Sequence, residues 1–193
     1  MRLVYYHVST IDSTNSLAKR GAAHWNREDL TAITTDEQTG GRGQYNRPWV
    51  MIKGKDIAVS YVLYTQSEHL ADIPFAAAIA VDKALNIPGV HFKWPNDVFV
   101  NQKKICGILV ETTPVENTTC LIIGIGINIL SGPADWTGIG QPVTSYFAET
   151  SQQIVPEKLL ESLSLNIAEI IPQVLRSGFS FIKNKYHLRS NKQ

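Results

Sequence analysis

Cysteine, net charge and long apolar runs are all scarce in this sequence of 193 residues. Its two cysteines, Cys106 and Cys120, lie in apolar runs with no histidine or further cysteine at metal-ligand spacing. Neither a zinc site nor a disulfide framework is indicated, and we expect two buried free thiols. A formal net charge of +1 provides no long-range field to hold a nucleic-acid backbone, so any anion site must be local.

Signals for export and membrane insertion are missing as well. The N-terminus lacks a charged segment followed by an apolar one, and the longest apolar run, 120–130, contains Asn128 and is too short to span a bilayer. A hydrophobic content of 44% and a charged content of 18% are ordinary for a globular protein. We therefore expect one cytoplasmic domain over residues 1–193, with no nucleic-acid or membrane partner.

The most informative stretch is 93–111, KWPNDVFVNQKKICGILVE. Strand-forming residues at 98–100 and 105–110 flank a polar turn at 101–104, a pattern that predicts a β-hairpin. Gly107 leaves room for a ligand against the backbone, and polar residues gather at the hairpin's ends. They are Lys93, Asn96, Asp97 and Lys104. Such a set suits a phosphate and its metal ion, although an ordinary solvated hairpin accounts for these residues equally well.

The rest of the chain alternates predicted strands with predicted helices. Aliphatic and aromatic runs predict strands at 3–8, 30–34, 56–64 and 120–130. Apolar spacing and capping residues predict helices from Ser13 to Gly21, over 73–85, around Tyr146, from Pro156 to Gly178 and around Ile182. The helix over 73–85 is apolar on one face and is expected to pack on the sheet.

Capping residues open the first predicted helix: Ser13, Thr14 and Asn15. Unpaired backbone donors at such a start, together with the two hydroxyls, can hydrogen-bond a small polar ligand. Plain N-capping explains the same residues.

Two glycine-rich stretches are further candidates for ligand binding. The segment 39–49, TGGRGQYNRPW, can surround a phosphate with its amides and the guanidinium groups of Arg42 and Arg47. It is not a P-loop, because the lysine and hydroxyl that end that motif are missing, and most such loops are only connections. Gly124 and Gly126 share one face of a predicted strand, where bare backbone admits either a flat ligand or a closely packed helix.

Taken together, these stretches resemble the catalytic domain of biotin protein ligases, which attach biotin to a lysine of biotin-dependent carboxylases. Four motifs occur in the family's order: STN at 13–15, GRG at 41–43 with Trp49 after it, KWPND through KK to GILVE, and GIGIN at 124–128. The resemblance implies an α+β fold of the class II synthetase-like biotin/lipoate ligase type, in which a mixed β-sheet has helices packed on one side and the site on its open face.

The resemblance also implies which residues hold each substrate. The ureido ring of biotin would bind to Ser13, Thr14 and Gln38, above Gly107 and the glycines of the last strand. The whole biotin site would comprise Ser13, Thr14, Asn15, Gln38, Gly41, Arg42, Gly43, Gln44, Lys104 and Gly107. ATP would bind to Trp49, Lys93, Asn96 and Asn128, and Mg²⁺ to Asp97. The catalytic residues would be Arg42 and Lys104, over the biotin carboxylate and the α-phosphate, with Asp97 orienting the acceptor lysine.

The implied reaction has two steps. The carboxylate of biotin attacks the α-phosphate of ATP to give biotinyl-5′-AMP and pyrophosphate. A lysine of a biotin carboxyl carrier protein domain, such as that of acetyl-CoA carboxylase, then attacks the mixed anhydride, while the glycine-rich loop keeps water away. Family members often pair through a sheet edge, so a homodimer is also an expectation.

The sequence departs from the family pattern in two places. Gln44 stands where an arginine commonly follows GRG, and we expect biotinyl-AMP to leave the enzyme faster as a result. The chain also begins at the catalytic domain and stops at Gln193, without the winged helix or the SH3-like barrel of some members. We therefore expect no repressor role. The enzyme is either truncated or naturally minimal, and we favour a truncated enzyme, which would bind biotin but turn over poorly.

Two other functions stay open. A lipoate or octanoate ligase or transferase has a related fold, but its glycine-rich signature differs, and a flexible acyl chain needs no hydroxyls placed for a ureido ring. A non-catalytic biotin-binding module would keep the pocket without turnover. Retention of Arg42, Lys104 and Asp97 favours an enzyme.

Overall fold

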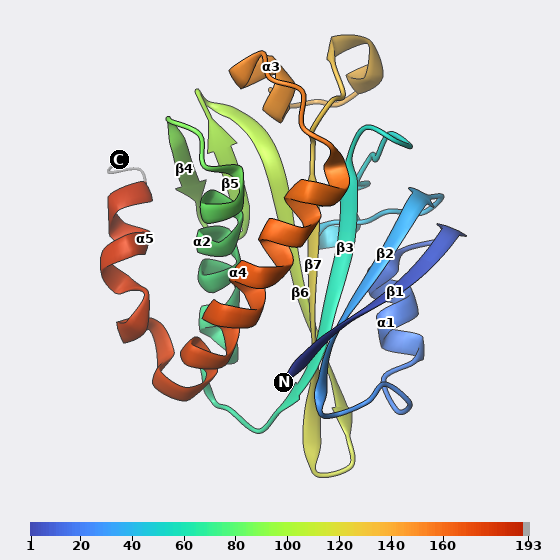
Figure 1. Ribbon diagram of the computed structural model, residues 1–193, viewed down its shortest axis with the longest axis vertical. Coiled ribbons are helices and arrows are strands. Elements are labelled where there is room, and N and C mark those ends of the chain that lie inside the picture. Colours follow the sequence, from blue (N-terminus) through green and yellow to red (C-terminus); the bar gives the residue numbers. More distant parts are fainter. Residues whose placement is uncertain (191–193) are drawn as a thin grey trace.

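A mixed sheet of seven strands forms the centre of the fold, in the order β1-β2-β3-β7-β6-β5-β4 (Figure 1). The computed structural model describes residues 1–190. The strands are β1 (Arg2–Ile11), β2 (Asp29–Gln38), β3 (Ile57–Thr65), β4 (Val90–Lys93), β5 (Asp97–Val100), β6 (Lys103–Val115) and β7 (Thr118–Ile127). β1 pairs with β2 in parallel, and the other neighbours pair antiparallel, so the expected mixed sheet is confirmed.

Most strands reach further than the sequence predicts, but β7 ends at Ile127 and not at residue 130, and one strand was not predicted. β2 runs on to Gln38, and β6 continues to pair with β7 as far as Val115 opposite Thr118. The unpredicted strand is β4, which has only four residues, VHFK, and pairs antiparallel with β5. Its residues alternate between apolar and polar, but a run of only four is too short for the alternation to be recognised. It nevertheless matters, because it ends at the predicted site residue Lys93.

Three helices cover one face of the sheet, in front of the strands in Figure 1: α2 (Ile73–Leu85), α4 (Pro156–Ser177) and α5 (Lys183–Arg189). The small side chains of Ala76 and Ala80 are fully buried and allow α2 to lie close to its neighbours. α4 contributes Leu163, Ile167 and Ile171, also fully buried, and each such side chain stabilises the fold by about 1.5–3 kcal/mol. This layer is the main hydrophobic core.

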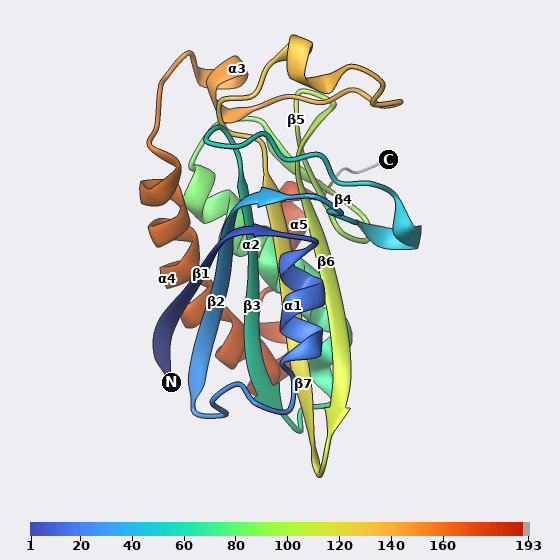
Figure 2. The ribbon, with the colours of Figure 1, turned by 90° about the vertical axis from the view of Figure 1, so that its right-hand side faces the viewer.

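The opposite face carries the short helix α1 (Thr14–Arg20), which lies in front of the sheet in Figure 2. Its Ala18 and the following Ala22 pack with Val62 and Ile122 in a second, smaller core. Side chains alternate along β3, so Tyr61 faces the main core while Ser60 and Val62 face α1. The long strands β3, β6 and β7 extend beyond this short helix, and the candidate site lies in the space that α1 leaves uncovered.

Short elements complete the described chain. They are α3 (Tyr146–Thr150) and the 3₁₀ segments η1 (Gln44–Asn46), η2 (His69–Asp72), η3 (Pro133–Trp136) and η4 (Gly178–Phe181). Cys106 and Cys120 are buried and free, as expected. Within residues 1–190, no helix combines the length and the apolar character needed to cross a bilayer.

Candidate active site

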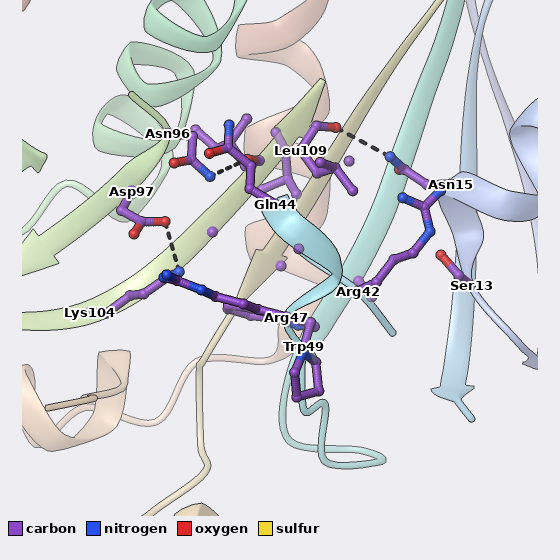
Figure 3. Close-up of a pocket in the computed structure, with 18 of the residues that line it drawn as sticks. Ser13, Asn15, Arg42, Gln44, Arg47, Trp49, Asn96, Asp97, Lys104 and Leu109 are labelled. Atoms are coloured by element: carbon purple, nitrogen blue, oxygen red, sulfur yellow. Dashed lines mark hydrogen bonds and ion pairs between the residues drawn. The ribbon is translucent and has the colours of Figure 1, made fainter. Parts of the chain in front are cut away.

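A cavity of about 280 Å³ opens on the α1 face of the sheet. It is lined by the start of α1, the end of β2, the loop of residues 39–49, the start of β3, the β4–β6 region, β7 and Gln141. Figure 3 shows Ser13 and Asn15 at one side, Asp97 and Lys104 at the opposite side, and the loop between them. Segments up to 96 residues apart in sequence therefore meet here through hydrogen bonds.

Neutral hydrogen-bonding groups form one end of the cavity. Ser13 is the N-cap of α1, and its hydroxyl accepts a hydrogen bond from the amide of Ser16 at 3.4 Å. Gln38, the last residue of β2, accepts from both the amide and the hydroxyl of Thr14, at 2.9 and 3.2 Å. The helix start is thus fixed to the strand end by uncharged groups that can both donate and accept.

A buried network continues from this end towards the sheet. The hydroxyl oxygen of Ser60, which is fully buried, lies 2.8 Å from Thr14 Oγ1 and 2.5 Å from Asn15 Oδ1. The amide nitrogen of Asn15 donates to the carbonyl of Leu109 at 3.2 Å and to Glu111 at 2.9 Å. The Asn15 side chain is therefore held on both sides and has little rotational freedom.

Charged groups form the other end. Lys104 Nζ lies 2.7 Å from the Asp97 carboxylate, and both side chains are largely buried. Two hydrogen bonds join Asn96 to β6. Its side-chain amide donates to the Ile108 carbonyl at 2.9 Å, and its backbone carbonyl accepts from the Ile108 amide at 3.0 Å. This end therefore presents a fixed cation beside a carboxylate, on a rigid part of the sheet.

The glycine-rich loop folds back on itself beside the cavity. The Gly43 amide donates to the Arg47 carbonyl at 2.8 Å, and the Trp49 amide donates to Gly41 at 2.9 Å. Tyr45, at φ 56°, adopts a left-handed conformation at the tip. Arg42 Nη2 lies 2.8 Å from Glu111 Oε2, which joins the loop to β6. The loop contains no β-strand or α-helix and only the short 3₁₀ segment η1 at its tip.

The bare backbone of the glycines is covered by two side chains. A methyl group at Gly107 or Gly126 would overlap the indole of Trp49, and one at Gly124 would overlap Asn15. The Lys104 ammonium lies 5.6 Å from the centroid of the Trp49 ring. Trp49 thus occupies the space expected for a ligand ring, because the loop brings its indole down onto the sheet.

The charge of Glu111 is stabilised by its surroundings. Burial raises the pKa of this carboxyl, but hydrogen bonds from Arg42 and Asn15, with the charges of Arg42 and Lys19, outweigh burial. The pKa of Glu111 therefore lies below its ordinary value, and the group is ionised at neutral pH.

The structure brings nearly all of the predicted site residues to this cavity. Those that line it are Ser13, Thr14, Asn15, Gln38, Arg42, Gly43, Gln44, Trp49, Lys93, Asn96, Asp97, Lys104 and Gly107. Two do not. Gly41 packs against the Trp49 carbonyl and the Gln38 side chain. Asn128 follows the end of β7, and its side-chain amide donates to the Thr144 carbonyl at 3.0 Å.

Other residues at the site were not predicted. Trp94 and Gln141 line the cavity, and Glu111 and Ser60 hold its lining residues in place. Glu111 ends the GILVE motif and follows Gly107 and Leu109 at a spacing of two, so strand alternation places it on their face. Ser60 lies in the middle of an apolar strand. Its only signal in the sequence is a hydroxyl residue within an otherwise apolar run.

The donor set limits how a metal ion can be held. Within the described residues, no three His, Cys, Asp or Glu side chains converge to form a metal cage. Asp97 supplies one carboxylate beside the cavity. Mg²⁺ keeps several of its waters and binds mainly through substrate phosphates. A single carboxylate therefore suits Mg²⁺ better than an ion that needs several protein ligands.

Neutral groups at one end, together with the cations Arg42 and Lys104 in its lining, define a binding domain for a small polar anion, built on an α+β sheet. Comparison with known proteins makes this class specific. A biotin--[acetyl-CoA-carboxylase] ligase of Paracoccus denitrificans is 34% identical over 190 residues, covering 93% of this chain and 78% of that protein. The bifunctional ligase/repressor BirA of Bacillus subtilis (strain 168) is 29% identical over 188 residues, covering 94% of this chain and 57% of that protein.

A solved structure gives the same result for the fold. Biotin protein ligase from Aquifex aeolicus in complex with biotin and ATP superposes with a TM-score of 0.81 at 28% identity, covering 97% of this chain and 78% of that chain. Residues 8–128 match the biotin/lipoate A/B protein ligase family. The chain belongs to this family and is a ligase.

Proposed function

We propose that this enzyme activates biotin with ATP as biotinyl-5′-AMP and transfers it to a lysine of a biotin carboxyl carrier protein domain. The family match and the names of the relatives support biotin as the substrate and acetyl-CoA carboxylase as the source of the acceptor. The single observation that carries the proposal is the cavity with its two unlike ends.

The neutral end suits the ureido group of biotin. A urea is uncharged and offers N–H donors and a carbonyl acceptor, and hydroxyls and amides supply partners for both. Thr14, Gln38 and Ser13 are such groups and are already oriented by hydrogen bonds between α1 and β2 and, for Ser13, within the first turn of α1. Preorganised partners lower the entropy cost of binding.

The charged end suits the meeting of two anions. The biotin carboxylate must approach the α-phosphate of ATP, and two unit charges 4 Å apart near a protein surface repel by about 4 kcal/mol. Lys104 lies at this end and Arg42 lines the cavity nearer Asn15, and these two cations would offset that repulsion. Lys93, Asn96 and Trp49 would hold the nucleotide, and the closed loop would keep water from the anhydride.

Mg²⁺ is proposed to bind at Asp97 with help from the phosphates, where it would neutralise charge on the departing pyrophosphate. Asp97 is paired with Lys104 in this structure, so its carboxylate is already fixed beside the cavity. We also propose that Asp97 orients the acceptor lysine in the second step.

Titration calorimetry with biotin, and separately with lipoate, tests this proposal. We expect biotin to bind, with tighter binding of ATP and Mg²⁺ afterwards, and lipoate not to bind measurably. Binding of lipoate without biotin would instead assign the chain to the lipoate branch of its family.

A single catalytic domain over residues 1–193, a location in the cytoplasm, pairing as a homodimer and faster loss of the adenylate through Gln44 all stay predictions.

A further inference from the structure

Glu111 lies just behind the cavity, where it contacts two parts of the site. Its Oε2 atom is 2.8 Å from Arg42 Nη2 of the glycine-rich loop and 2.9 Å from Asn15 Nδ2 of α1. Lys19 Nζ lies further away, 3.9 Å from Oε1. One carboxylate oxygen on β6 therefore joins the helix that forms the neutral end to the glycine-rich loop that carries Arg42.

The pair of Arg42 and Glu111 is shielded from solvent. The Glu111 side chain is 18% exposed and that of Arg42 is 27% exposed, so their attraction is screened less than that of a surface pair. An arginine side chain is long and loses considerable rotamer freedom when it is held in one place. Across the described residues, Glu111 is the only hydrogen-bonding side chain recorded for the Arg42 guanidinium, and the bond uses Nη2 alone. The fork-like geometry of arginine leaves other N–H groups to bind an anion.

We propose that Glu111 is a positioning residue for the ligase reaction, which holds the Arg42 guanidinium where it can bind the biotin carboxylate and the adenylate phosphate. This inference rests on the proposed function. Glu111 acts through Arg42 and does not itself touch the substrate. Because Asn15 shares the same carboxylate oxygen, Glu111 also fixes the helix start relative to the loop.

A simple counter-ion would behave in the opposite way. If Glu111 only neutralised Arg42, removing its negative charge would raise the positive potential of the cavity and tighten the binding of an anion. If Glu111 positions Arg42, removing its charge releases the side chain, and binding of the anion weakens. The sign of the change in biotin affinity therefore separates the two roles.

The test is Glu111→Gln, which keeps the size of the side chain and an oxygen that can accept from Asn15 but removes the charge. We expect biotin to bind about tenfold more weakly by calorimetry, KM for biotin to rise with a smaller change in kcat, and captured biotinyl-AMP to be released faster. Glu169→Gln, which removes the carboxylate of a surface pair with Lys83 on the helical face, is the matched control and should leave these values unchanged.

A double-mutant cycle with Arg42→Ala shows whether Glu111 acts through Arg42. In the Arg42→Ala background, Glu111→Gln should weaken biotin binding by less than twofold, because there is no guanidinium left to position. If Glu111→Gln does not fold, Glu111→Asp keeps the charge but withdraws it from Arg42, and it should weaken binding in the same direction.

Two results for Glu111→Gln would contradict the positioning role. Tighter or unchanged biotin binding by Glu111→Gln, or a full tenfold loss that persists without Arg42, would overturn the positioning role. Failure of the wild-type chain to bind biotin would instead overturn the proposed function, so the two failures are distinguishable.

Discussion

Gly124 in β7 has almost no space above its backbone, because Asn15 lies directly on it. Asn15 cannot easily move away, since Ser60, Leu109 and Glu111 all contact its side-chain amide. The absence of a side chain at Gly124 is therefore required by a hydrogen-bonded group of the site and not by the conformation of the strand.

Replacing Gly124 with alanine should disturb the neutral end of the cavity. The added methyl group would displace Asn15 and break its hydrogen bonds, so we expect biotin affinity to fall at least tenfold and the free energy of unfolding to fall by about 1–3 kcal/mol. Calorimetry and chemical denaturation measure the two effects. Gly140→Ala is the control, because nothing lies within 4 Å of the added methyl group there, and equal behaviour of the two variants would refute this account of Gly124.

The charge of Glu111 also predicts how stability depends on pH. The folded-state pKa lies below the ordinary value of 4.5, so the ionised carboxylate stabilises the fold above that value. This contribution is lost as the pH falls through the folded-state pKa. We expect the wild type to be about 1 kcal/mol more stable than Glu111→Gln at neutral pH, and the difference to shrink below about pH 4.5. A difference that grows in acid, in denaturation curves measured from pH 7 to pH 3, would contradict this.

Among the elements, local patterns predicted most of the sheet and helices. The hairpin of β5 and β6, the start of α1 and its end at Gly21, and the long amphipathic α4 all follow from short-range signals. β4 escaped detection because four residues carry too little pattern. The place of Trp49 could not be predicted from sequence, since it depends on the path of a loop that lacks regular hydrogen bonding. The same holds for the contact between Arg42 and Glu111, which are 69 residues apart.

The loop of residues 39–49 places the Trp49 indole on Gly107 and Gly126. Its Nε1 atom is buried and has no hydrogen-bond partner in the described part of the chain. An unpaired buried donor costs about 1–3 kcal/mol, which favours release of the ring when a ligand takes its place. The loop would then close over the ligand with Trp49 on the nucleotide side.

This movement predicts a change in tryptophan fluorescence on binding biotin. The emission should shift because the indole of Trp49 leaves the sheet, and Trp49→Phe should abolish most of the shift. Trp136→Phe, in η3, is the control and should retain it. An equal shift in the wild type and in Trp49→Phe would mean that the ring does not move.

For the whole molecule, the sheet divides the protein into a stabilising side and a functional side. The helical face contains most of the large buried side chains, whereas the α1 face contains the cavity and its polar network. The sequence identifies the buried helical faces through their apolar spacing and the site residues through the resemblance to a family, but the strand order that brings β7 between β3 and β6 is a long-range property. That order places Gly124 and Gly126 at the middle of the site.

Whether the chain activates biotin is tested by biotin-dependent exchange of radiolabelled pyrophosphate into ATP, which measures the first step without an acceptor protein. We expect exchange with biotin and Mg²⁺, a loss of at least a hundredfold in Lys104→Gln, and no loss in the surface variant Lys83→Gln. Exchange with lipoate and none with biotin, or full exchange by Lys104→Gln, would contradict this expectation.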